Sequence, residues 1–72
     1  MLFRKRNTRE GIRTIRLKIL KLLADGFLVK QITSMLGEEE PNIRYHIRMI
    51  LKKFNAKNIP NACYLAAKEG LI

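Results

Sequence analysis

Residues 41–54 read PNIRYHIRMILKKF and carry the clearest periodicity in the chain. At about 100° per residue, their apolar side chains fall within roughly 100° of a helical wheel: Ile43, Ile47, Ile50, Leu51 and Phe54. This stripe predicts an amphipathic helix with one buried face. The opposite face is polar and basic, points away from the core and is free to bind; it is formed by Arg44, Tyr45, Arg48 and Lys52.

The residues before this helix predict a turn and a second, shorter helix. Acidic side chains favour the start of a helix and proline fits its first turn, so Glu38-Glu39-Glu40-Pro41 marks where the helix begins. Upstream, a short apolar period ends at Gly37 and consists of Phe27, Ile32, Met35 and Leu36. Two short helices joined through a glycine-containing turn are typical of a helix-turn-helix motif, whose second helix enters the major groove of DNA.

Two further helices complete the predicted fold. The first begins near Ile12 and ends at Asp25-Gly26, and its face repeats at helical spacing in Ile15, Ile19, Leu22 and Leu23, with Leu20 beside them. After a break at Asn55 and Asn58, the last helix is expected over residues 59–69, with Pro60 in its first turn. No strand-like alternation competes. The sequence therefore predicts an all-α, four-helix bundle-like domain.

Length and composition exclude several classes of protein. The 72 residues allow one small domain, and 47% hydrophobic against 29% charged residues is enough apolar material for a core. The longest apolar run, residues 62–67, is far below the roughly 20 residues of a membrane span. With one cysteine, Cys63, and one histidine, His46, we expect no disulfide, metal site, cofactor or enzyme activity. Cys63 is expected to be a small buried or interface residue rather than a redox sensor.

The charge balance indicates a polyanionic partner. Fifteen Lys and Arg against six Asp and Glu give a net charge of +9, and nucleic acid is the leading candidate for the partner that this charge attracts. Net charge alone also allows an anionic membrane surface or an acidic protein. Residues 1–11 contain Arg4, Lys5, Arg6 and Arg9 and are expected to be a flexible basic arm, which either stays solvated or adds phosphate or minor-groove contacts.

The chain resembles the LuxR/GerE-type helix-turn-helix domain over residues 12–71. The most specific pieces are the Leu22-Leu23-Ala24-Asp25-Gly26 end of the first helix and the run from Ile43 to Phe54. The resemblance also includes Lys30-Gln31-Ile32, Leu36, Asn58 and Ala62. It implies a DNA-binding transcription regulator of residues 12–72, whose third helix, about residues 41–54, reads double-stranded DNA.

The resemblance assigns roles to individual residues by position. It implies that three side chains face base edges: Arg44, Tyr45 and Arg48. It implies phosphate contacts, which set position without reading sequence, for Lys30, Asn42, His46, Lys52 and Lys53. A packed imidazole is an equal alternative for His46. The two arginines suit guanine, because the guanidinium fork matches its O6 and N7 acceptors.

The resemblance further implies a homodimer that binds an inverted repeat. The last helix would make the two-fold contact through small apolar side chains: Ala62, Cys63, Leu65 and Ala66. Core packing alone is the alternative explanation of this face. We expect a cytoplasmic, nucleoid-associated regulator that acts alone under control of its abundance and contacts the transcription machinery, although a fragment of a longer regulator is the alternative.

The sequence departs from the family pattern at two places. Ile15-Arg16 stands where the family usually has Arg-Glu, and Glu39 stands where it has a serine cap, so local bonding must differ. The three glutamates also set negative charge near the expected DNA backbone. Two other readings stay open: a nonspecific nucleic-acid-binding protein, or a protein-interaction module that uses Tyr45, Met49 and the acidic turn.

Overall fold

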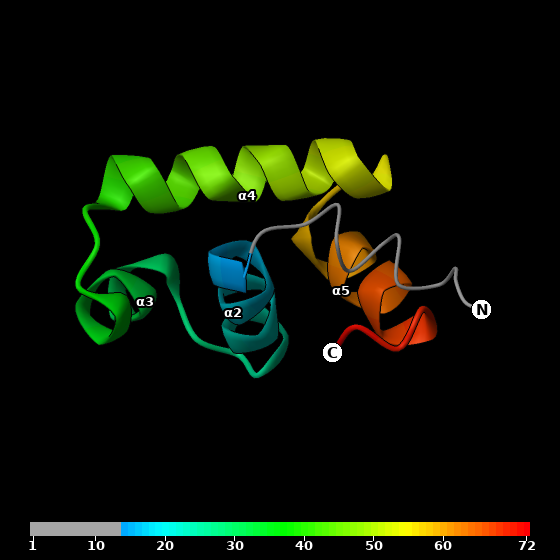
Figure 1. Ribbon diagram of the computed structural model, residues 1–72, viewed down its shortest axis with the longest axis horizontal. Coiled ribbons are helices and arrows are strands. Elements are labelled where there is room, and N and C mark those ends of the chain that lie inside the picture. Colours follow the sequence, from blue (N-terminus) through cyan, green and yellow to red (C-terminus); the bar gives the residue numbers. More distant parts are fainter. Residues whose placement is uncertain (1–13) are drawn as a thin grey trace.

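The computed structural model describes residues 14–72, which form four helices and no strand (Figure 1). In chain order these are α2 (Thr14–Ala24), α3 (Val29–Leu36), α4 (Glu40–Phe54) and α5 (Ile59–Lys68). The predicted all-α fold is confirmed, and α5 ends one residue before the expected position. The predicted basic arm and the expected start of the first helix at Ile12 lie outside the described residues.

Helix α4 is the longest element and lies across the other three (Figure 1). It packs against α2, α3 and α5 in turn. Helix α2 lies between α3 and α5 and contacts both, whereas α3 and α5 do not contact each other within the described part of the chain. The fold therefore depends on α2 and α4 crossing at its centre.

The core is made of aliphatic side chains from all four helices. The buried residues are Ile19 and Leu20 of α2, Ile32 of α3, Ile43, Ile47 and Ile50 of α4, and Ala62 and Ala66 of α5. The stripe predicted for α4 is thus confirmed, with Leu51 and Phe54 half-buried at its edge. Met35, which the apolar period placed on the inner face of α3, is 51% exposed, because Ile32 and Leu36 are the residues of that short helix that pack inward.

The turn between α3 and α4 depends on a left-handed residue. Gly37 has φ +67°, a conformation that costs glycine little and most other residues more. Its N–H and that of Glu38 both donate to the carbonyl of Thr33, which closes the end of α3. The glycine therefore ends α3 and directs the chain into α4, as its position in the sequence predicts.

The break between α4 and α5 uses asparagine in the same way. Asn55 adopts φ +53° at the end of α4, and the N–H of Ala56 donates to Leu51. Asn58 then caps α5: its side-chain oxygen accepts from the N–H of Asn61 at 2.8 Å. The side-chain oxygen of Asn61 accepts in return from the N–H of Lys57 at 3.0 Å. These paired bonds fix where α5 leaves α4.

The small apolar face predicted on the last helix is divided in the structure. Ala62 and Ala66 are 1% and 0% exposed, because their small side chains let α5 approach α2 and α4 closely. They therefore pack inside this chain instead of facing outward. Cys63 and Leu65 are half-buried at the edges of the helix, and its outward face carries Pro60, Tyr64 and Ala67.

Replacing the first buried isoleucine of α4 tests this packing. Ile43 is fully buried between α4 and its neighbours, so Ile43→Ala is expected to lower the free energy of unfolding by about 2–5 kcal/mol in urea titrations. Leu28→Ala is the control, because Leu28 is 68% exposed and its truncation is expected to change little. Equal effects of the two substitutions would contradict the assignment of the core.

Candidate nucleic-acid interface

The outer face of α4 is a basic surface held in place by the buried stripe beneath it. Because Ile43, Ile47 and Ile50 face the core, the residues on the other side of the helix are fixed outward. All four residues predicted for this face are exposed: Arg44, Tyr45, Arg48 and Lys52. We call them the outer face of α4.

The remaining predicted phosphate contacts lie on a neighbouring flank of α4 and on α3. Asn42 and Lys53 are exposed, and His46 between them is half-buried. Lys30 is exposed on the first turn of α3, one element away. Lys52 and Lys53 also occupy the last turn of α4, where positive charge is favoured by the helix dipole. The predicted residues thus lie on two adjacent strips of α4, with one residue on α3.

Tyr45 lies among three nitrogen-bearing side chains. The Cζ atom of Arg16 is 5.7 Å from the centre of its ring, and that of Arg48 is 6.0 Å away. The ring of His46 is tilted against it, with the ring centres 5.7 Å apart. Cations over an aromatic face are attracted by its quadrupole, so these contacts orient a ring that is otherwise 46% exposed.

Arg16 of α2 joins this cluster to the body of the domain. Its Nε–H donates to Nδ1 of His46 at 3.1 Å in a half-buried contact between α2 and α4. Nδ1 accepts this bond and therefore carries no proton of its own there. The contact supports the packed alternative for His46. Arg16 was not among the predicted site residues. The departure at Ile15-Arg16 did indicate a place where the local bonding must differ.

The acidic turn contacts the residues predicted to touch DNA. Arg44 donates from Nε to Oε2 of Glu40 at 2.8 Å, and its Nη2 is 2.7 Å from the same oxygen. Two residues earlier in the chain, a similar contact forms: Nδ2 of Asn42 donates to Oε1 of Glu38 at 3.4 Å. Two of the predicted contact residues are therefore each held by a glutamate four residues before them.

The third glutamate occupies the cap of α4. Glu39 has extended backbone angles, and its side chain accepts no capping hydrogen bond. Its carbonyl instead accepts from the N–H groups of Asn42 and Ile43. Beside this end of the helix, a hollow of about 470 Å³ is lined by Glu40, Pro41, Arg44 and Arg48. This end of α4 therefore combines two guanidinium groups with one carboxylate.

Other chemistry is sparse in the described residues. No group of three or more His, Cys, Asp or Glu in residues 14–72 is placed to hold a metal ion. Burial raises the pKa of the Cys63 thiol above its usual value, so this cysteine is a weaker nucleophile at neutral pH than a solvated one. None of helices α2–α5 has both the length and the apolar character to cross a bilayer.

A comparison with known families decides what this arrangement is. The profile described as bacterial regulatory proteins, luxR family (GerE), matches residues 16–66, from Arg16 in α2 to Ala66 in α5. The chain belongs to the LuxR family. No curated protein matches the chain.

Membership identifies the chain as a DNA-binding regulatory helix-turn-helix domain, a class of protein that is not typically enzymatic. In this LuxR-family domain α3 and α4 form the helix-turn-helix, and α2 and α5 support α4 from below. Two contacts distinguish its site. Glu39 caps α4 without a side-chain bond, and Arg16 of α2 donates to His46 of α4.

Neutralising Glu40 tests whether the acidic turn restrains Arg44. Exposed ion pairs at this spacing contribute only about 0.3–0.5 kcal/mol, so a DNA acceptor can displace Glu40. Glu40→Gln is expected to raise affinity for duplex DNA roughly two- to fivefold by fluorescence anisotropy, because it frees Arg44 and removes a negative charge from the interface.

Glu69→Gln is the matched control for Glu40→Gln. It makes the same change in net charge at the end of α5, away from α4. Equal gains in affinity for the two variants would mean that only bulk charge matters and would contradict a local restraint on Arg44.

Proposed function

We propose that this LuxR-family domain binds specific sequences in double-stranded DNA by inserting α4 into the major groove. The observation that carries the proposal is the fixed outward orientation of the basic face of α4 on a helix-turn-helix of the family. A major groove accommodates one α-helix, and the helix-turn-helix places its second helix there. α4 is the second helix of this motif.

Three side chains of the outer face of α4 are proposed to contact base edges. Arg44 and Arg48 project from successive turns, and each matches the paired acceptors of guanine. Tyr45 lies near Arg16 and Arg48 and offers an apolar ring to a thymine methyl or a hydroxyl to a phosphate. The cation contacts around Tyr45 reduce the freedom that it loses on binding.

Phosphate contacts are proposed for the residues on the borders of this face. Lys52, Lys53 and Asn42 are exposed along α4, and Lys30 extends the line onto α3. Backbone contacts of this kind set the position of the domain on the duplex without reading sequence. For His46 the proposal is weaker, because its imidazole is half-buried and Nδ1 already accepts from Nε of Arg16.

A homodimer on an inverted repeat is proposed through the outward face of α5. Tyr64 is 60% exposed, with the Lys68 ammonium 5.9 Å from its ring centre. Cys63 and Leu65 border this face, whereas Ala62 and Ala66 contribute from within by bringing α5 close to the core. Two-fold symmetry would place the two copies of α4 about 34 Å apart, one turn of DNA.

As a DNA-binding regulator, the protein is proposed to act in the bacterial cytoplasm on the nucleoid. Its contact with the transcription machinery is part of the same proposal.

Selection from a random duplex pool at physiological ionic strength tests sequence-specific binding. An enriched inverted repeat is the expected result. On that sequence, Arg48→Ala is expected to relax the preference at one position and to cost roughly 1–3 kcal/mol there. The comparison is Lys52→Ala, which is expected to weaken binding uniformly across sequences because it removes a phosphate contact.

The other results of the selection favour the rival readings. Retention without enrichment would indicate a nonspecific nucleic-acid-binding protein. No retention would indicate a protein-interaction module that uses Tyr45, Met49 and the acidic turn.

The dimer has a separate test in α5. Tyr64→Glu is expected to abolish the cooperative binding of two chains to the inverted repeat in gel-shift titrations, while one chain still binds a half-site, because two buried carboxylates would face each other across the axis. Lys57→Gln, an exposed substitution before α5 that also lowers the net charge by one, is the charge control. Unchanged cooperativity in Tyr64→Glu would contradict a dimer contact through this face.

A further inference from the structure

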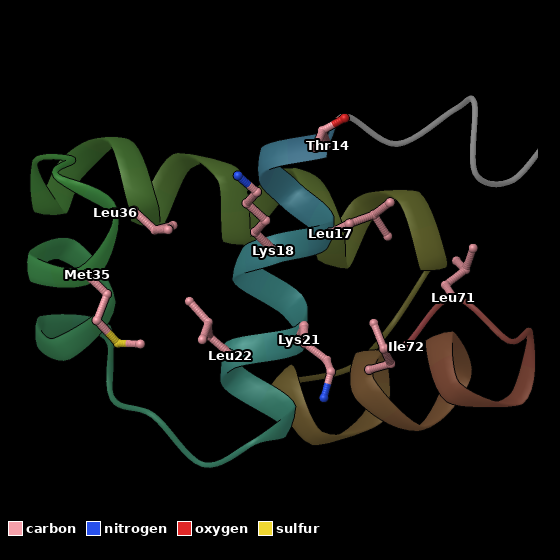
Figure 2. A pocket seen from close by; sticks show the side chains of 9 residues that line it. All are labelled: Thr14, Leu17, Lys18, Lys21, Leu22, Met35, Leu36, Leu71 and Ile72. Atoms are coloured by element: carbon pink, nitrogen blue, oxygen red, sulfur yellow. The ribbon is translucent and has the colours of Figure 1, made fainter.

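A groove with an apolar floor lies on the side of the domain away from α4 (Figure 2). It has a volume of about 680 Å³ and runs over α2, the end of α3 and the residues that follow α5. Its lining consists of Thr14, Leu17, Lys18, Lys21, Leu22, Met35, Leu36, Leu71 and Ile72. None of these residues belongs to α4, so the groove is separate from the candidate nucleic-acid interface.

The floor of the groove is incompletely covered by the chain itself. Leu17, Leu22 and Leu36 pack against the core cluster but stay half-exposed toward the groove, where Figure 2 shows their side chains. Met35 is 51% exposed at the α3 edge, opposite Leu22. Methionine is flexible and polarizable and adapts to a variety of apolar partners. Several aliphatic side chains on one concave surface indicate an interaction site.

The charge at the rim is positive. Lys18 and Lys21 are exposed on successive turns of α2, and no acidic residue lines the groove. Lys21 lies 3.1 Å from Oδ1 of Asp25, whereas Lys18 has no ion pair within residues 14–72. An acidic group entering the groove would therefore meet one lysine directly and compete with Asp25 for the other.

The positive charge at the rim favours an acidic partner in the groove over a second copy or another segment of this chain. A second copy is proposed to pair through α5, and in the groove it would bring its own net charge of +9 against Lys18 and Lys21. Residues 1–13 carry five basic side chains and one acidic side chain, so this segment would be repelled by Lys18 and Lys21. An acidic partner is instead attracted at long range and paired at the rim.

We propose that the groove docks an acidic amphipathic helix of another protein. Such a helix places apolar anchors at i, i+3 or i+4 and i+7 along the floor, in the helix-in-groove mode. Glutamate or aspartate beside that stripe would pair with Lys18 and Lys21. Because α4 takes no part, the partner and DNA are expected to bind at the same time. The proposal does not depend on the function proposed for α4.

A synthetic peptide of about four helical turns is the probe. It carries leucine at the anchor positions and glutamate beside them, and its partner peptide has lysine in place of every glutamate. We expect saturable binding of the glutamate peptide to the full chain by fluorescence anisotropy, and none of the lysine peptide. Binding is expected to persist when the chain is bound to duplex DNA.

Two pairs of variants locate the peptide on the surface. Lys18→Glu and Met35→Glu are expected to weaken its binding at least about tenfold, because one reverses the rim charge and the other puts a carboxylate on the apolar floor. Their controls are Lys57→Glu and Leu28→Glu, which make the same changes at exposed positions outside the groove and are expected to bind like the unmodified chain. Circular dichroism confirms that each variant is folded.

Several results would overturn the proposal. Absence of saturable binding, or equal binding of the lysine peptide, would show that the groove does not select an acidic helix. Equal losses of peptide affinity in Lys57→Glu and Lys18→Glu would show that the peptide responds only to the net charge of the protein. Displacement of DNA by the peptide would place the peptide on α4. If the unmodified protein is a dimer in solution without DNA and the Met35→Glu variant is a monomer, a second copy occupies the groove.

Discussion

Burial of one isoleucine stripe on α4 organises the domain. Ile43, Ile47 and Ile50 contact the core, and α4 packs in turn against α2, α3 and α5. The same constraint fixes the other side of the helix toward solvent. Stability and the proposed recognition are therefore coupled in one element: the residues that hold α4 cannot bind a ligand, and those proposed to bind are excluded from the core.

The outer face of α4 is more constrained than its exposure suggests. Arg44 is paired with Glu40, Asn42 with Glu38, and Tyr45 lies near two guanidinium groups. Arg16 reaches this face from α2 and ties the imidazole of His46 to the body of the domain. The contacts around Tyr45 keep its ring in few rotamers, which lowers the entropy lost on binding. The glutamates of the acidic turn act in the other direction, because a DNA acceptor has to displace them from Arg44 and Asn42.

The helices could be predicted because each carries a strong local signal. The period of α4, Gly37 at the turn and the asparagines before α5 determine structure through contacts within a few residues. The side of α5 that faces inward could not be predicted in the same way. Its small residues surround much of the helix, and only packing against α2 and α4 selects Ala62 and Ala66 for the core. The contact between Arg16 and His46 joins residues 30 positions apart, and no local pattern predicts it.

The ion pair between Glu40 and Arg44 also affects how the domain responds to its ionic environment. A cation that leaves water for a phosphate displaces a counterion condensed on DNA, and the number displaced sets how steeply affinity falls with salt. Arg44 is proposed to contact a base rather than a phosphate, so it displaces no condensed counterion, and the Glu40 carboxylate that it leaves takes up a cation from solution. Binding to DNA is therefore expected to release fewer counterions than there are basic side chains at the interface. A contact count taken from the salt dependence of this domain would therefore fall short of its geometric contacts, by the arginine that the acidic turn holds.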